Sequence, residues 1–191
     1  MTRGRTLFGV AAVIAILAVQ ALAAPFVVFP QAVQLPSPDG RFVVRNADTE
    51  RPPSAFVGTF HSLWLVETAT GRSRKLCDYV GVAAVAWSGN NLLLINQYLS
   101  KRTSRAMVFS PSSQDPVVLD KPTLITLVAV EQRDTLRGND RVFIEALRVE
   151  GENLVFSVWG YGAHDASGFH WACQYALENG AVTCTEARSA R

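Results

Sequence analysis

A pair of hairpins that recurs three times along the chain constrains the fold more than any other feature. The first hairpin of each pair has a turn rich in Ser, Asp, Asn, Glu and Gly between two apolar runs, at residues 37–40, 88–91 and 150–153. Such residues favour turns, and Gly and Asn tolerate the positive φ angles that hairpins often require. A second hairpin follows each first one. Because two hairpins supply four strands, each pair predicts a four-stranded antiparallel sheet.

The three units span about residues 30–76, 82–119 and 142–186, and residues 24–191 are expected to form a single all-β domain. The turns of the three second hairpins contain Gly71, Gln114 and Gly180. When the three units are aligned on these residues, the apolar runs on both sides of the turns also align. The alternative fold is a β-sandwich, in which hairpins are also regularly spaced. Repetition is favoured because the order of the two hairpins is the same in all three units.

The first unit carries a resemblance to a known repeat. Residues 35–44 read LPSPDGRFVV, and residues 62–76 read SLWLVETATGRSRKL. This succession of a strand, a Ser-Pro-Asp-Gly turn, a strand, and a strand ending in acid-x-x-Thr-Gly resembles a TolB-type, WD40-like β-propeller repeat. The resemblance implies four-stranded, propeller-like units and a role in binding rather than in catalysis.

The chain is short for a closed propeller of this kind. Such a ring needs about four blades of about 45 residues each, whereas the chain has 191 residues including its leader. Three units leave an open partial ring, a ring completed by a homo-oligomer, or a sandwich as alternatives.

Residues 1–23 have the pattern of a secretory signal peptide. Arg3 and Arg5 precede an uncharged apolar run, and Ala21-Leu22-Ala23 fits the small-x-small cleavage site. The alternative is an uncleaved inner-membrane anchor, which Pro25 and Pro30 disfavour. We therefore expect a periplasmic or secreted protein with no stable membrane span after cleavage.

The charge of the chain supports no nucleic-acid partner. The leader holds two of the 18 basic residues and none of the 16 acidic ones, so residues 24–191 carry no net charge. Nucleic-acid binding depends on clusters of Lys and Arg. The basic run at residues 101–105 is interpreted as a solvated hairpin loop. Residues 45–54 are interpreted as a polar, proline-containing surface loop inside the first unit, and residues 132–141 as a charged surface loop or a short helix before the third.

Two of the three cysteines are predicted to form a disulfide. If the third unit's second turn is the four-residue loop 177–180, Cys173 and Cys184 lie opposite one another on adjacent strands. A three-residue loop would turn one sulfur to the other face, and two reduced thiols are the alternative. Cys77 is expected to be a buried small residue rather than a reactive thiol.

Residues 159–171 form the candidate binding segment, with Trp159, Tyr161, His164, Asp165 and His170 as the candidate contact residues. Trp and Tyr offer flat apolar rings with polar groups, which suits a sugar-like ligand. The two histidines and the aspartate suit a divalent metal, but their spacing matches no standard motif, and we assign no metal or cofactor. The alternative is that the aromatic rings pack on the sheet, as we expect for Trp64 and Trp87.

The sequence supports binding more than catalysis. It contains no G-x-S-x-G motif and no phosphate-binding glycine loop, so no catalytic residue is assigned. We expect an exported binding or scaffolding protein of the bacterial envelope whose partner is a protein or a small molecule. The alternative is a small metal-dependent or other hydrolase that uses the segment 159–171.

Overall fold

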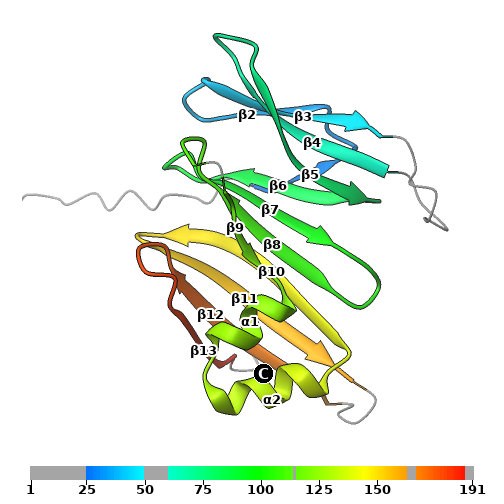
Figure 1. Cartoon of the computed structure of the whole chain (residues 1–191), viewed down its shortest axis with the longest axis vertical. Coiled ribbons are helices and arrows are strands. Elements are labelled where there is room, and N and C mark those ends of the chain that lie inside the picture. Colours follow the sequence, from blue (N-terminus) through cyan, green and yellow to red (C-terminus); the bar gives the residue numbers. More distant parts are fainter. Residues whose placement is uncertain (1–24, 50–59, 114, 163–166, 188–191) are drawn as a thin grey trace, which may run out of the picture.

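The described residues of the computed structural model form three antiparallel β-sheets that are stacked one on another (Figure 1). The structure describes residues 25–49, 60–113, 115–162 and 167–187. In spatial order, the first sheet consists of β2 (Gln34–Pro36), β3 (Phe42–Asp48), β4 (Phe60–Glu67) and β5 (Ser73–Val80). The second consists of β1 (Val27–Phe29), β6 (Ala83–Trp87), β7 (Leu93–Tyr98), β8 (Ser104–Phe109) and β9 (Val117–Leu119). The third consists of β10 (Arg141–Glu150), β11 (Asn153–Tyr161), β12 (Phe169–Ala176) and β13 (Val182–Glu186).

The all-β prediction with antiparallel sheets is confirmed, and several local expectations are corrected. Over the described residues the sheets form no closed barrel, and a propeller ring stays a prediction. The strand β1, which pairs with β6, was not indicated by the hairpin pattern. The polar segment 45–54 is not a loop at its start, because β3 continues through Asp48. In the chain, two helices follow β9 and precede β10: α1 (Lys121–Leu127) and α2 (Val130–Gly138), of which only the second was foreseen as an option.

The turn of the first unit is held by its own side chains. Ser37 Oγ donates to Asp39 Oδ1 (2.6 Å) and accepts from the backbone N–H of Phe42 (3.0 Å). Gly40 takes a positive φ of 70°, which a residue without Cβ adopts at no steric cost. Hydrogen bonds from Ser37, and then from Arg41, lower the pKa of Asp39 to about 2.

The turn of the second unit has the same geometry with a different sequence. Ser88 Oγ donates to Asn90 Oδ1 and accepts from the backbone N–H of Leu92 (2.9 Å). Asn91 stands where the first turn has Gly40, with a φ of 60°. Asn is the residue that most often replaces Gly in this region of backbone space, so the turn keeps its form.

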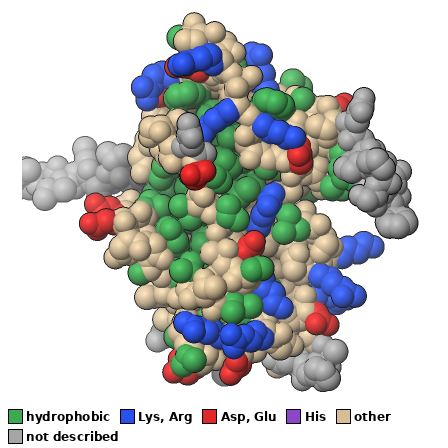
Figure 2. Space-filling view, in the orientation of Figure 1, with side chains coloured by type: hydrophobic (Ala, Val, Ile, Leu, Met, Phe, Trp, Pro, Cys, Tyr) green, Lys and Arg blue, Asp and Glu red, His purple; other side chains and the backbone are tan. Residues whose placement is uncertain are grey.

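The second sheet is buried on both faces, because successive side chains of its strands enter different cores. On one face, Ile95 and Met107 pack against Leu63 of the first sheet. On the other, Leu94 and Val108 belong to the core shared with the third sheet and the two helices. On the side of the molecule shown in Figure 2, hydrophobic side chains gather over the central part of the stack.

Buried polar contacts join the second and third sheets. Asn96 Nδ2 donates to the carbonyl oxygen of Ile144 (2.5 Å), and Ser104 Oγ accepts from the N–H of the same residue (2.7 Å). Each of these polar groups is thereby satisfied inside the core, where an unpaired group would be costly. Ser104 therefore lies in a buried strand position rather than in the solvated loop expected for residues 101–105.

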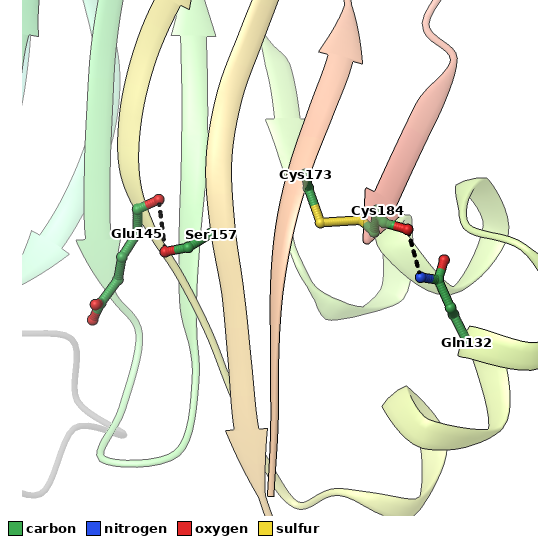
Figure 3. The surroundings of a disulfide bond; sticks show 5 residues. All are labelled: Gln132, Glu145, Ser157, Cys173 and Cys184. Atoms are coloured by element: carbon green, nitrogen blue, oxygen red, sulfur yellow. Dashed lines mark hydrogen bonds between the residues drawn. A yellow bond between two sulfur atoms is a disulfide. The ribbon is translucent and has the colours of Figure 1, made fainter. Parts of the chain in front are cut away.

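The hairpin of β12 and β13 has the predicted four-residue loop. Gly180 N–H donates to Ala176 O (2.8 Å), and Ala176 N–H donates to Ala181 O (2.9 Å). This register places Cys173 opposite Cys184, and the disulfide between them is confirmed (Figure 3). The figure also shows Gln132 of α2, whose Nε2 donates to Cys184 O (3.0 Å) and fastens the helix to β13.

Neither helix in the described part of the chain is long and apolar enough to cross a membrane. Residues 1–24 lie outside the described residues, so the signal peptide stays a prediction.

Candidate functional site

Three of the five candidate binding residues come together on the outer face of the third sheet, the face turned away from the second sheet. Along β11, Phe156 and Val158 belong to the core, so the alternating residues Trp159 and Tyr161 point outward. His170 of β12 is the register partner of Trp159 and lies on the same face. His164 and Asp165 lie outside the described residues.

The outer face carries a row of aromatic rings. The ring of Phe143 on β10 stacks on Trp159 with 4.3 Å between centroids, and Trp159 is followed by Tyr161 at 6.2 Å with nearly parallel planes. The guanidinium carbon of Arg141 lies 4.8 Å from the centroid of Tyr161. Phe143 is buried beneath its neighbours, whereas Trp159 is half-buried and 37% of Tyr161 is exposed. The row therefore offers a supported and partly exposed aromatic surface.

Polar groups lie beside the aromatic row on an open, shallow surface with a volume of about 540 Å³. Glu145 of β10, Ser157 of β11 and His170 of β12 lie around Trp159 and Tyr161. Ser157 Oγ donates to the backbone oxygen of Glu145 (3.5 Å), while the Glu145 carboxylate extends away from this bond (Figure 3). The surface thus combines aromatic rings with a carboxylate, a hydroxyl and an imidazole.

The carboxylate of Glu145 is held by a residue of the second sheet. The hydroxyl of Tyr98, at the end of β7, donates to Glu145 Oε1, and this hydrogen bond raises the pKa of Tyr98 to about 12. The Tyr98 ring also lies 6.1 Å from Phe143. The site is therefore built from two sheets, and a contact between residues 47 positions apart fixes its rim.

Gly160 leaves the strands of this site room to approach. A Cβ at this position would lie 2.3 Å from the backbone oxygen of Arg141 and 2.8 Å from the ring of Phe169. Any other residue would force β10 and β12 away from β11. Gly160 therefore keeps Trp159 and Tyr161 in register with their neighbours.

The remaining candidates are placed as follows. Trp87 and Trp171 lie in the cores, whereas Trp64 is half-buried on the outer face of the first sheet, where its indole N–H donates to Ser62 Oγ (2.7 Å). Cys77 is buried as predicted, and burial raises the pKa of its thiol to about 11, which disfavours the reactive thiolate.

No group of three or more metal-ligating side chains is found among the residues that the structure describes. Because His164 and Asp165 are not among them, the metal-dependent hydrolase stays a prediction for the segment 159–171.

The site includes residues that the sequence pattern did not single out. Phe143, Glu145 and Ser157 alternate on two paired strands, which is the signal that could have indicated them. Tyr98 gives no such signal, because it reaches the site from another sheet.

Comparison with known proteins identified no related protein. No protein-family model matches the chain, and no curated protein and no solved structure gives a significant match.

Proposed function

We propose that this protein is an exported binding protein of the bacterial envelope and that the outer face of the third sheet contacts its ligand. The aromatic row of Phe143, Trp159 and Tyr161, beside three hydrogen-bonding side chains on a rigid sheet, carries this proposal. Ligand sites typically combine aromatic walls with a few polar groups in this way.

Export to the periplasm or the exterior is supported by two independent features. Residues 1–23 have the three-part pattern of a signal peptide. The disulfide between Cys173 and Cys184 is of a kind that persists in oxidising compartments and is rare in the bacterial cytosol.

The ligand class that this surface fits best is an oligosaccharide. The apolar C–H face of a sugar ring packs on an indole or a phenol ring, while its hydroxyls need both donors and acceptors. Trp159 and Tyr161 supply the rings, and Glu145, Ser157 and His170 supply the polar groups.

A glycan array tests this proposal, with two tryptophan variants as a matched pair. Trp159 and Trp64 are both half-buried on outer faces, one on the third sheet and one on the first. We expect the parent protein to bind a subset of oligosaccharides, Trp159→Ala to weaken binding by about tenfold, and Trp64→Ala to bind like the parent.

Two results would count against oligosaccharide binding at the outer face of the third sheet. The absence of any oligosaccharide binding by the parent would exclude this ligand class. An equal loss in both tryptophan variants would show that the effect is on the fold rather than on the proposed surface.

A further inference from the structure

A second cavity lies between the first and second sheets. Tyr98, whose hydroxyl contacts Glu145 at the rim of the outer face, also lines this cavity. It encloses about 390 Å³, a size typical of sites for small molecules. Its charged residues are Lys75 and Asp78 of β5 and Arg105 of β8. Its apolar wall includes Phe60 and Val80.

The charges in this cavity do not cancel. Lys75 Nζ and Asp78 Oδ1 form an ion pair at 2.7 Å, so their charges compensate each other. Arg105 is the remaining charged residue among those that line the cavity. Arg105 Nε donates to the neutral amide oxygen Oε1 of Gln97 (3.0 Å), and no carboxylate among the described residues forms an ion pair with it. Because an arginine remains protonated at all physiological pH values, the described lining of the cavity carries one positive charge without an ion-pair partner.

The guanidinium of Arg105 is held in place before any ligand arrives. Gln97 is only 3% exposed, and its Nε2 donates to the backbone oxygen of Asp78 (2.9 Å). The amide is therefore fixed from one side and presents its oxygen to Arg105 Nε. This arrangement occupies one N–H of the guanidinium and leaves the two terminal nitrogens for a planar anion, which the guanidinium geometry matches.

The strand position of Arg105 explains why the sequence did not indicate this site. The basic run 101–105 was interpreted as a solvated loop, but β8 begins at Ser104, so Arg105 belongs to the strand. It lies on the same face as Met107, which packs in the core between the first and second sheets. Arg105 is therefore half-buried and lines the cavity.

We propose that this cavity binds a small organic carboxylate, with the carboxylate on Arg105 and an apolar part against Phe60 and Val80. A carboxylate accepts two parallel hydrogen bonds from a guanidinium, and burial strengthens such charged bonds. The apolar part follows from the wall: Val80 is 39% exposed at the cavity and gains by being covered.

Calorimetric titration with a matched pair of probes tests this site. The probes are 3-phenylpropionate and its neutral amide, which differ in charge but hardly in shape. We expect the parent protein to bind the carboxylate about tenfold more tightly than the amide. Arg105→Met should abolish this preference, and Arg105→Lys, which keeps the charge but not the planar fork, should reduce it.

Arg45→Met is the control, since Arg45 is an exposed arginine on the outer face of the first sheet and should leave binding unchanged. Equal affinity of the parent for the two probes, no binding of the carboxylate at millimolar concentration, or a preference that survives in Arg105→Met would overturn the proposal. If Arg105→Met does not fold, the probe pair on the parent and on Arg105→Lys still decides. Tyr98 borders both sites, but neither experiment changes it, and the substitutions of the two tests lie at different residues. Either proposal can therefore fail alone.

Discussion

The two faces of the third sheet have similar residues but different surroundings. On the inner face, Phe156 and Trp171 are nearly excluded from solvent and pack against the second sheet and the helices. On the outer face, Trp159 and Tyr161 keep part of their surface exposed beside His170. Aromatic content alone therefore does not tell which rings hold the fold and which are free to contact a ligand. The side of the strand decides, because alternate residues of β11 face opposite ways.

The largest effect that tests this comparison is on the free energy of unfolding. Phe156→Ala removes a side chain that is 2% exposed and leaves a cavity, so we expect a loss of about 3–5 kcal/mol. Tyr161→Ala, on the outer face of the same strand, should lose about 1 kcal/mol, mainly through its contact with Arg141. Urea unfolding midpoints, with unchanged slopes, measure both. Equal losses would mean that the two faces are equally covered.

The disulfide is expected to make the next largest contribution, again on the inner face. Cys173 is fully buried, and the bond closes a loop between residues 11 positions apart. Reduction should lower the free energy of unfolding by about 2–3 kcal/mol, since the unfolded chain gains freedom. The control is the double variant Cys173→Ala, Cys184→Ala, whose stability the same reductant should not change. An unchanged free energy of unfolding of the parent protein after reduction would contradict this expectation.

The sequence was informative where turn chemistry determines structure. A four-residue loop ending in Gly180 sets the pairing of β12 with β13, and that register alone places Cys173 opposite Cys184. The second turn was harder to recognise, since Asn91 stands where the first turn has Gly40, yet both residues take similar positive φ angles. Local composition therefore predicts hairpins and their cross-strand partners over short distances.

The outer site was less predictable because a β-bulge changes the register of β10. Extending the pairing of Glu150 with Asn153 along a regular hairpin would place Phe143 opposite Gly160. The register instead shifts between Glu145 and Arg148, so that Phe143 lies opposite Trp159. The extra residue of this bulge thereby places the Phe143 ring beside Trp159, and no local sequence signal indicated the position of the bulge. Contacts between sheets, such as that of Tyr98 with Glu145, are equally invisible to hairpin patterns.

The smallest expected effect concerns the rim of the outer face, where Tyr98 contacts the Glu145 carboxylate. The hydrogen bond from Tyr98 to the Glu145 carboxylate raises the pKa of Tyr98 to about 12 from an ordinary value of 10.0. Because the folded pKa is the higher one, this pair stabilises the fold fully below pH 10 and progressively less as the pH rises through about 12.

Glu145→Gln removes the negative charge, so the pKa of Tyr98 should fall toward its ordinary value. Titration of the near-ultraviolet tyrosinate absorbance measures this shift, and Tyr98→Phe identifies which part of the signal belongs to Tyr98. Above pH 10 the parent should also lose stability more steeply than Glu145→Gln. An identical titration curve in the parent and Glu145→Gln would show that the carboxylate does not control Tyr98, and that the outer rim lacks the charged contact that distinguishes it from the inner face.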